Sequence, residues 1–174
     1  MMGEFSDLDQ PFDPADAFES LDRPTQASEI QRSASPERTL RIIVGVDGSP
    51  SSLAALRQAL IVASAFRATV EAIGVWHLPG TVNAFYPAGN WSPKQDAQNM
   101  MAEAAEAVFG DAPPPWFRSS VREGAAARVL IAASSDADLL IVGSRGHSGV
   151  VGLLLGSVSA ACAEGAHCPV LIMH

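Results

Sequence analysis

Between residues 40 and 174, short apolar runs alternate with longer segments of helical periodicity, and this alternation restricts the fold more than any other feature. Five runs indicate strands, the third of them weaker than the others: residues 40–46, 69–76, 116–123, 137–143 and 168–174. Runs that are apolar on both faces are typical of parallel strands covered by helices on both sides. The sequence therefore predicts an α/β fold, a doubly wound, Rossmann-like parallel sheet of five strands with helices on both faces.

The segments between these runs carry helix signals. Ser49 and Ser92 are each followed by proline, the combination expected of a helix N-cap and the first helical position. Apolar residues then recur at helical spacing, ending near Phe66 in the first of these segments. We expect further helices over residues 125–136 and about 156–165.

The first 38 residues differ in character from the rest. They hold nine acidic residues against three arginines, a balance of −6, so only −2 of the formal net charge of −8 belongs to residues 39–174. Such a segment buries too little apolar surface to offset the entropy of the chain. We expect a disordered acidic tail over 1–38 and one folded domain over 39–174. Phe5, Phe12 and Phe18 leave open a partner-binding segment within the tail.

Composition argues against several classes of function. The nearly neutral domain has no basic stripe for nucleic acid, and no apolar run is long enough to span a bilayer. The N-terminus lacks the basic and apolar regions of a secretory signal. Cys162 and Cys168 are too few for a disulfide framework and fit small core thiols better than a metal site. We expect a cytoplasmic protein without nucleic-acid, membrane or metal partners.

Residues 142–159, VGSRGHSGVVGLLLGSVS, form a glycine-rich segment after the fourth predicted strand. A hydrolase nucleophile elbow needs G-x-S-x-G, but here Gly149 follows Ser148 one position too early. A Walker loop needs a lysine, and the only lysine of the chain is the distant Lys94. The dinucleotide pattern G-x-G-x-x-G is not met either. The segment therefore belongs to another kind of glycine loop.

The remaining pattern is Gly143, two residues, Gly146, nine residues, and then Gly156 and Ser157. We interpret Gly143 as a place where a ligand approaches the backbone, and Gly146 as a residue with positive φ whose neighbouring amides form an anion nest. Gly156 and Ser157 begin a helix, where free amides favour a phosphate. The spacing alone also fits a glycine-rich turn without a ligand.

The loop after the first predicted strand, DGSPSS at residues 47–52, has a similar ligand-binding composition. Ligands of doubly wound sheets bind at the carboxyl ends of strands, beside the point where the strand order reverses. If the first and fourth strands are neighbours, the two loops form one site.

Over about residues 38–174, the sequence resembles the universal stress protein family. Two stretches carry the resemblance: IIVGVDGSPSS at the first strand, and residues 137–173, which contain G-x2-G-x9-G-[ST], the signature of family members that bind ATP. The resemblance implies the strand order 3-2-1-4-5, which puts the first strand beside the fourth. It also implies a homodimer, often formed through the last strand, and PVLIM suits that role as an exposed apolar edge.

The resemblance assigns roles to residues of both loops. Asp47 would contact the adenine or ribose end, Val75 would offer backbone groups to the adenine edge, and the glycine signature would surround the ribose and phosphates. Arg145 either grips phosphate or faces solvent, and His147 fits a loop histidine near phosphate better than a catalytic base. The candidate binding residues are Gly45, Asp47, Gly48, Ser49, Val75, Gly143, Ser144, Arg145, Gly146, His147, Gly156, Ser157 and Val158.

The resemblance therefore favours a regulatory ATP-binding protein of a stress response, in which Mg²⁺ could accompany the nucleotide and a regulatory partner is still to be identified. No Walker lysine, Walker B acid or evident base supports fast turnover, so we expect no enzyme. Two alternatives stay open: a slow ATP hydrolase using the same pocket, and a nucleotide-free dimerisation module. Residues 77–91, with Phe85, Tyr86 and Trp91, fit either a lid over the nucleotide or surface packing.

Overall fold

The computed structural model describes residues 38–78, 92–146 and 155–174. The chain divides into two units, Met1–Arg38 and Thr39–His174, and the second unit holds the fold described below. The division coincides with the change in composition at residue 38. The predicted disorder of the tail, the aromatic segment before Ser92, and His147 lie outside the described residues, so those expectations stay predictions.

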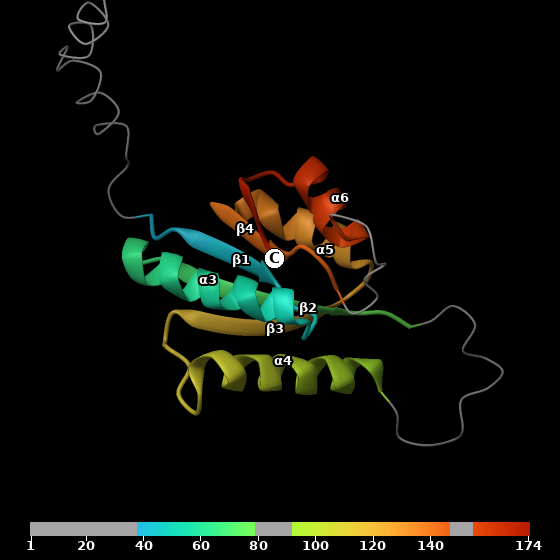
Figure 1. Cartoon of the computed structure of the whole chain (residues 1–174), viewed down its shortest axis with the longest axis horizontal. Helices are drawn as coiled ribbons and strands as arrows, with labels where there is room; N and C mark the ends of the chain where they lie inside the picture. The colour runs from blue at the N-terminus through green and yellow to red at the C-terminus, as the bar shows by residue number, and fades with distance from the viewer. Residues whose placement is uncertain (1–37, 79–91, 147–154) are drawn as a thin grey trace, which may run out of the picture. The chain divides into compact units, whose positions relative to one another are not determined.

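The described residues form a parallel sheet of five strands in the order β3-β2-β1-β4-β5 (Figure 1). This confirms the expected fold class and strand order. The middle residues of β1 and β4 are all buried, as expected for strands covered on both sides. The strands are β1 (Arg41–Gly45), β2 (Thr69–Trp76), β3 (Phe117–Glu123), β4 (Leu139–Gly143) and β5 (Val170–Met173).

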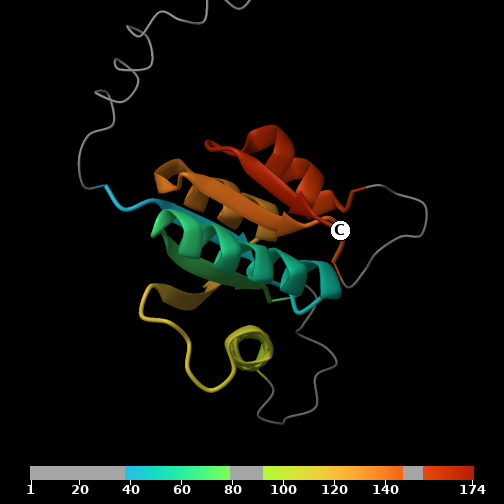
Figure 2. The same ribbon diagram turned by 60° about the vertical axis from the view of Figure 1, so that its left-hand side comes forward.

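Two helices cover each face of the sheet (Figures 1 and 2). One face carries α3 (Pro50–Phe66) and α4 (Pro93–Phe109), and the other carries α5 (Ala126–Ala133) and α6 (Ser157–Gly165). A short 3-10 turn, η1 (Ser134–Asp136), ends the segment that we expected to be wholly α-helical. Among the helices described, none combines the length and hydrophobicity needed to cross a membrane.

The predicted helix caps are present. Ser49 Oγ accepts a hydrogen bond from the amide of Ser52, and Ser92 Oγ accepts one from Gln95, both at 3.3 Å. Each serine is followed by the proline that begins the helix. The caps fix where α3 and α4 start, and the start of α3 determines one wall of the site described below.

Apolar layers fill the space between the sheet and each helix pair. Val44 packs in the layer under α3 and α4, whereas Ile43 packs in the layer under α5 and α6. Neighbouring residues of a strand point to opposite faces, so a strand between two such layers needs apolar residues at every position. This requirement explains the uninterrupted apolar runs of the central strands.

A polar cluster replaces the apolar layer over part of β2 and β3. The Glu71 carboxylate accepts hydrogen bonds from Arg41 at 2.7 Å, Arg122 at 2.5 Å and Ser120 at 3.0 Å. Burial by itself raises the pKa of Glu71, but the hydrogen bonds from Arg41, Arg122 and Ser120 together hold that pKa below its ordinary value of 4.5. Two of the polar residues that weakened the strand pattern of β3, Ser120 and Arg122, therefore bind the Glu71 carboxylate.

Replacing Glu71 with Gln should lower the free energy of unfolding at neutral pH by about 1–2 kcal/mol, because charged hydrogen bonds are lost. Because the pKa of Glu71 is lower in the folded state, the stabilisation by its carboxylate is fully present at pH values above the unfolded-state pKa. This stabilisation is lost as the pH falls through the folded-state pKa. Denaturation of wild type and variant at neutral pH and in steps below pH 4.5 should show the difference shrinking. Glu103→Gln, on the exposed side of α4, is the control, and a Glu71→Gln difference that stays constant with pH would contradict this account.

Candidate functional site

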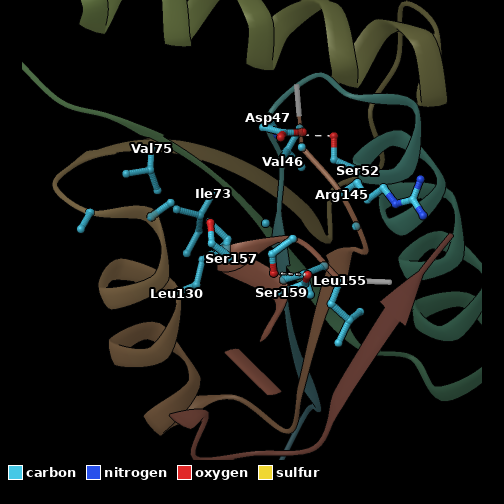
Figure 3. A pocket seen from close by; sticks show the side chains of 18 of the residues that line it. Val46, Asp47, Ser52, Ile73, Val75, Leu130, Arg145, Leu155, Ser157 and Ser159 are labelled. Carbon is cyan, nitrogen blue, oxygen red and sulfur yellow. Dashed lines mark hydrogen bonds between the residues drawn. The ribbon is translucent and has the colours of Figure 1, made fainter. Parts of the chain in front are cut away.

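A cleft of about 790 Å³ opens at the carboxyl ends of the strands, where β1 and β4 end side by side. The strand order reverses here, because α3 leaves β1 on one face of the sheet while α5 enters β4 from the other. Figure 3 shows the side chains around the cleft. The residues that line it are Gly45, Val46, Asp47, Ser52, Ile73, Val75, His77, Gly124, Ala125, Ala126, Leu130, Val142, Gly143, Arg145, Gly146, Leu155, Gly156, Ser157, Val158 and Ser159.

The structure brings most of the candidate residues to this one cleft, including members of both glycine-containing loops. Ser49 and Ser144 instead line a second hollow of about 430 Å³, which shares Arg145 and Gly146 with the cleft. Gly48 lines neither, and His147 lies outside the described residues. The candidates that line the cleft are Gly45, Asp47, Val75, Gly143, Arg145, Gly146, Gly156, Ser157 and Val158.

The loop after β1 is held in shape by the Asp47 side chain. Asp47 Oδ1 accepts hydrogen bonds from the Ser49 amide at 3.0 Å and the Ser49 hydroxyl at 2.6 Å. Gly48 supplies the turn between them with a φ of 81°, which favours glycine. The Ser52 hydroxyl accepts a hydrogen bond from the Asp47 amide at 3.3 Å. The carboxylate is thereby fixed at the edge of the cleft.

The same loop holds the backbone that follows β4. The hydroxyl of Ser49 lies 3.2 Å from the Arg145 carbonyl, and the Ser51 hydroxyl also donates to that carbonyl. A Cβ at Gly143 would lie 2.8 Å from main-chain atoms of Ser51 and Ser52. The structure thus gives a reason for glycine at 143 that we did not predict, because the first turn of α3 occupies the space that a side chain would need. Gly143 also lines the cleft, and the approach of a ligand to its backbone stays a prediction.

Gly146 differs from the interpretation drawn from its position. Its φ is not positive, so the expected left-handed conformation is wrong. A Cβ at Gly146 would lie only 2.5 Å from Asp47 Oδ2. Gly146 therefore permits the close approach of the Asp47 carboxylate to the glycine loop.

The first turn of α6 opens on the cleft without a side-chain cap. The Gly156 amide donates to the Ser144 carbonyl at 2.7 Å, which ties the start of the helix to the end of β4. The first intrahelical hydrogen bond runs from the Ala160 amide to Gly156, so the amides of Ser157 and Val158 precede it. These donors and the exposed Ser157 hydroxyl form the part of the cleft that best suits an anion.

Another part of the cleft lining is apolar. Ile73, Val75 and Leu130 lie together there in Figure 3. A Cβ at Gly45 would meet the Leu130 side chain at 2.8 Å, so Gly45 lets α5 pack closely over the end of β1. The chemistry of this wall suits an uncharged aromatic group.

Val75 adds a polar edge to this apolar wall. The β1–β2 pairing ends at Gly45 and Ile73, and the Ile73 carbonyl accepts a hydrogen bond from the Val46 amide at 3.0 Å. Alternate residues of a strand direct their backbone groups to the same neighbour, so the amide and carbonyl of Val75 face the side that β1 has left. Within the described residues, these two groups have no strand partner on that side.

Sequence reasoning missed the contribution of the third strand's loop, residues 124–126, and of Leu130. The stretch EGAAAR places a glycine directly after the third predicted strand, and this signal could have pointed to the loop. All carboxyl ends of parallel strands meet at one edge of the sheet, so each such loop is a candidate wall.

The structure also describes the two cysteines. Cys162 is fully buried and Cys168 is half-buried, and both thiols are free. Burial raises the pKa of each thiol. Over residues 38–78, 92–146 and 155–174, no group of three His, Cys, Asp or Glu side chains could hold a metal ion.

Comparison with known proteins identifies the family to which this sequence and fold are similar. Residues 39–174 match the model of the universal stress protein family. Universal stress protein Rv2623 of Mycobacterium tuberculosis is 32% identical over 152 residues, which cover 81% of this chain and 50% of that protein. Universal stress protein MJ0531 of Methanocaldococcus jannaschii is 31% identical over 139 residues, which cover 76% of this chain and 81% of that protein. The chain thus spans about half the length of the mycobacterial relative.

Among solved structures, a universal stress protein in complex with cAMP superposes with a TM-score of 0.60 at 27% identity. The match covers 79% of this chain and 99% of that one. Sequence and fold therefore agree over the whole of the described sheet. This chain belongs to the universal stress protein family.

Proposed function

We propose that the cleft binds an adenine nucleotide, with ATP as the ligand, and that the protein is a cytoplasmic regulatory module that holds the nucleotide. The observation that carries the proposal is the pairing of two opposite chemistries in one cleft. An apolar wall, where the backbone groups of Val75 have no strand partner among the described residues, lines the same cleft as the uncapped first turn of α6. The related structure in complex with cAMP supports an adenine nucleotide as the class of ligand.

The base would lie on the wall formed by Ile73, Val75 and Leu130. A backbone amide and carbonyl of one residue match the acceptor and donor on the edge of adenine, so the free groups of Val75 are suited to bind it. Asp47 also lines the cleft, and its carboxylate could accept a hydrogen bond from ribose.

The phosphates would lie at the start of α6. The amides of Ser157 and Val158 and the Ser157 hydroxyl are neutral donors at the positive end of the helix. The close tie between Gly156 and Ser144 sets where these donors point. Mg²⁺ would accompany the triphosphate and is bound in such sites mainly through phosphate oxygens.

Replacing Ser157 with Glu should weaken binding of Mg-ATP by roughly a hundredfold, through the loss of a donor to a charged group and added repulsion. The helix should still form, because a negative charge in the first turn stabilises it. Isothermal titration of wild type and variant measures the change, and circular dichroism checks the fold.

Ala163→Glu is the matched control for this experiment. Ala163 is exposed on α6 and does not line the cleft, about 9 Å further along the helix. It adds the same charge to the same element, so its Mg-ATP affinity should stay within about threefold of wild type. Equal affinities for Ser157→Glu and wild type would show that the phosphates do not bind at this helix.

We propose holding of the nucleotide rather than its rapid hydrolysis. Asp47 is the only acidic residue among the described cleft residues, and its Oδ1 is already engaged by Ser49. Turnover should therefore be far below the roughly 10 s⁻¹ typical of enzymes. A phosphate-release time course tests this, and the Ser157→Glu variant reports any contaminating ATPase. Fast turnover that disappears in that variant would favour the hydrolase alternative.

We also propose a homodimer in which the last strand takes part. β5 is an edge strand whose four residues are all half-buried, so neither face is fully covered by the described helices. Light scattering of the full chain at micromolar concentration should give twice the monomer mass of 18.2 kDa. A monomer mass under these conditions would rule out this assembly and, with it, the alternative of a dimerisation module.

A further inference from the structure

The cleft has few groups that could neutralise a highly charged ligand. Of the described residues that line it, only Asp47, His77 and Arg145 have ionisable side chains. The only lysine of the chain, Lys94, lies in the first turn of α4 and does not line the cleft. The neighbouring sequence segments 79–91 and 147–154 contain no lysine or arginine. Among the described residues that line the cleft, a cationic partner for phosphate could come only from Arg145 or His77.

The backbone of Arg145 is tied to the loop after β1, and its side chain points away from the apolar wall (Figure 3). Its carbonyl is the group held by the hydroxyls of Ser49 and Ser51. In Figure 3 its side chain extends away from Ile73, Val75 and Leu130. Arg145 also lines the second hollow with His174. The next arginine along the sheet edge, Arg122, is bound to Glu71 at 2.5 Å.

A carboxylate stands beside the glycine loop instead. Asp47 Oδ2 lies 2.5 Å from the position that a Cβ of Gly146 would take, so the charge is directly over the loop. The two hydrogen bonds from Ser49 to Oδ1 keep the carboxylate in this place. Every negative charge added to a bound ligand near the loop therefore meets a fixed negative charge.

We infer that the cleft selects adenine nucleotides by their net charge. It binds a singly charged cyclic monophosphate without a metal ion, and it binds a triphosphate more tightly as its complex with a divalent cation than alone. The inference rests on the proposed function, since it concerns the same site. The groups that would donate hydrogen bonds to phosphate are neutral amides and hydroxyls at the start of a helix. That helix start is equivalent to about half a positive charge, and the negative charge of the Asp47 carboxylate opposes it.

Isothermal titration of the full chain at constant ionic strength tests this selection with three probes: cAMP, ATP with a chelator, and ATP with excess Mg²⁺. We expect cAMP to bind at least about tenfold more tightly than metal-free ATP, which corresponds to one unfavourable charge pair at short range. Excess Mg²⁺ should restore ATP affinity by about tenfold and leave cAMP affinity unchanged.

The substitution Asp47→Asn removes the negative charge of residue 47 and keeps a side chain of nearly the same shape. The amide oxygen of Asn can still accept from Ser49, so the loop keeps its hydrogen bonds, and any loss of ribose binding affects all probes alike. The ratio of the dissociation constants of metal-free ATP and cAMP should therefore fall by about tenfold in Asp47→Asn. Glu164→Gln is the control, because it removes an exposed charge from α6 that does not line the cleft, and it should leave the ratio unchanged.

Two results would overturn the inference while the proposed function stands. Metal-free ATP could bind as tightly as cAMP, or Arg145→Gln could weaken ATP by tenfold or more with no effect on cAMP, which would identify Arg145 as the missing cation. If none of the adenine nucleotides binds, the proposed function itself is wrong and the inference fails with it.

Discussion

The site depends on how closely the first turn of α3 packs against the end of β4. Gly143 permits this approach, because a Cβ there would lie 2.8 Å from the main chain of Ser51 and Ser52. The approach brings Ser49 and Ser51 within reach of the Arg145 carbonyl, although Ser49 and Arg145 are 96 residues apart in the sequence. Two loops from different parts of the chain thereby become one wall, and the remaining features of the cleft are arranged around it.

That wall gives the cleft an unusual balance of charge for the nucleotide site that we propose. The same packing that joins the loops puts the Asp47 carboxylate over Gly146, where many phosphate sites would have a cation. Attraction for an anion is left to the uncapped start of α6, whose amides are fixed by the tie between Gly156 and Ser144. Affinity would therefore come from shape and from neutral donors on one side and apolar contact with α5 on the other.

At the β2–β3 side of the sheet, a partly buried carboxylate is paired with arginine side chains, in contrast to Asp47 in the cleft. Glu71 is half-buried, and three hydrogen bonds from Arg41, Ser120 and Arg122 offset the cost of removing its carboxylate from water. Because β3 supplies two of these donors, it cannot be apolar on both faces as β1 and β4 are. The cluster joins three strands at an edge where no described helix fully covers the sheet.

The sequence by itself determined the elements and their order, because apolar periodicity and the caps at Ser49 and Ser92 act within a few residues. The family resemblance supplied the strand order, and with it the meeting of the two loops. Only the tertiary structure decided why Gly143 and Gly146 are glycines, where the Arg145 side chain points, and that Leu130 and residues 124–126 complete the apolar wall. Each of these depends on the approach of atoms from separate elements, such as α3 against β4 or α5 against β1, and no local pattern encodes that distance.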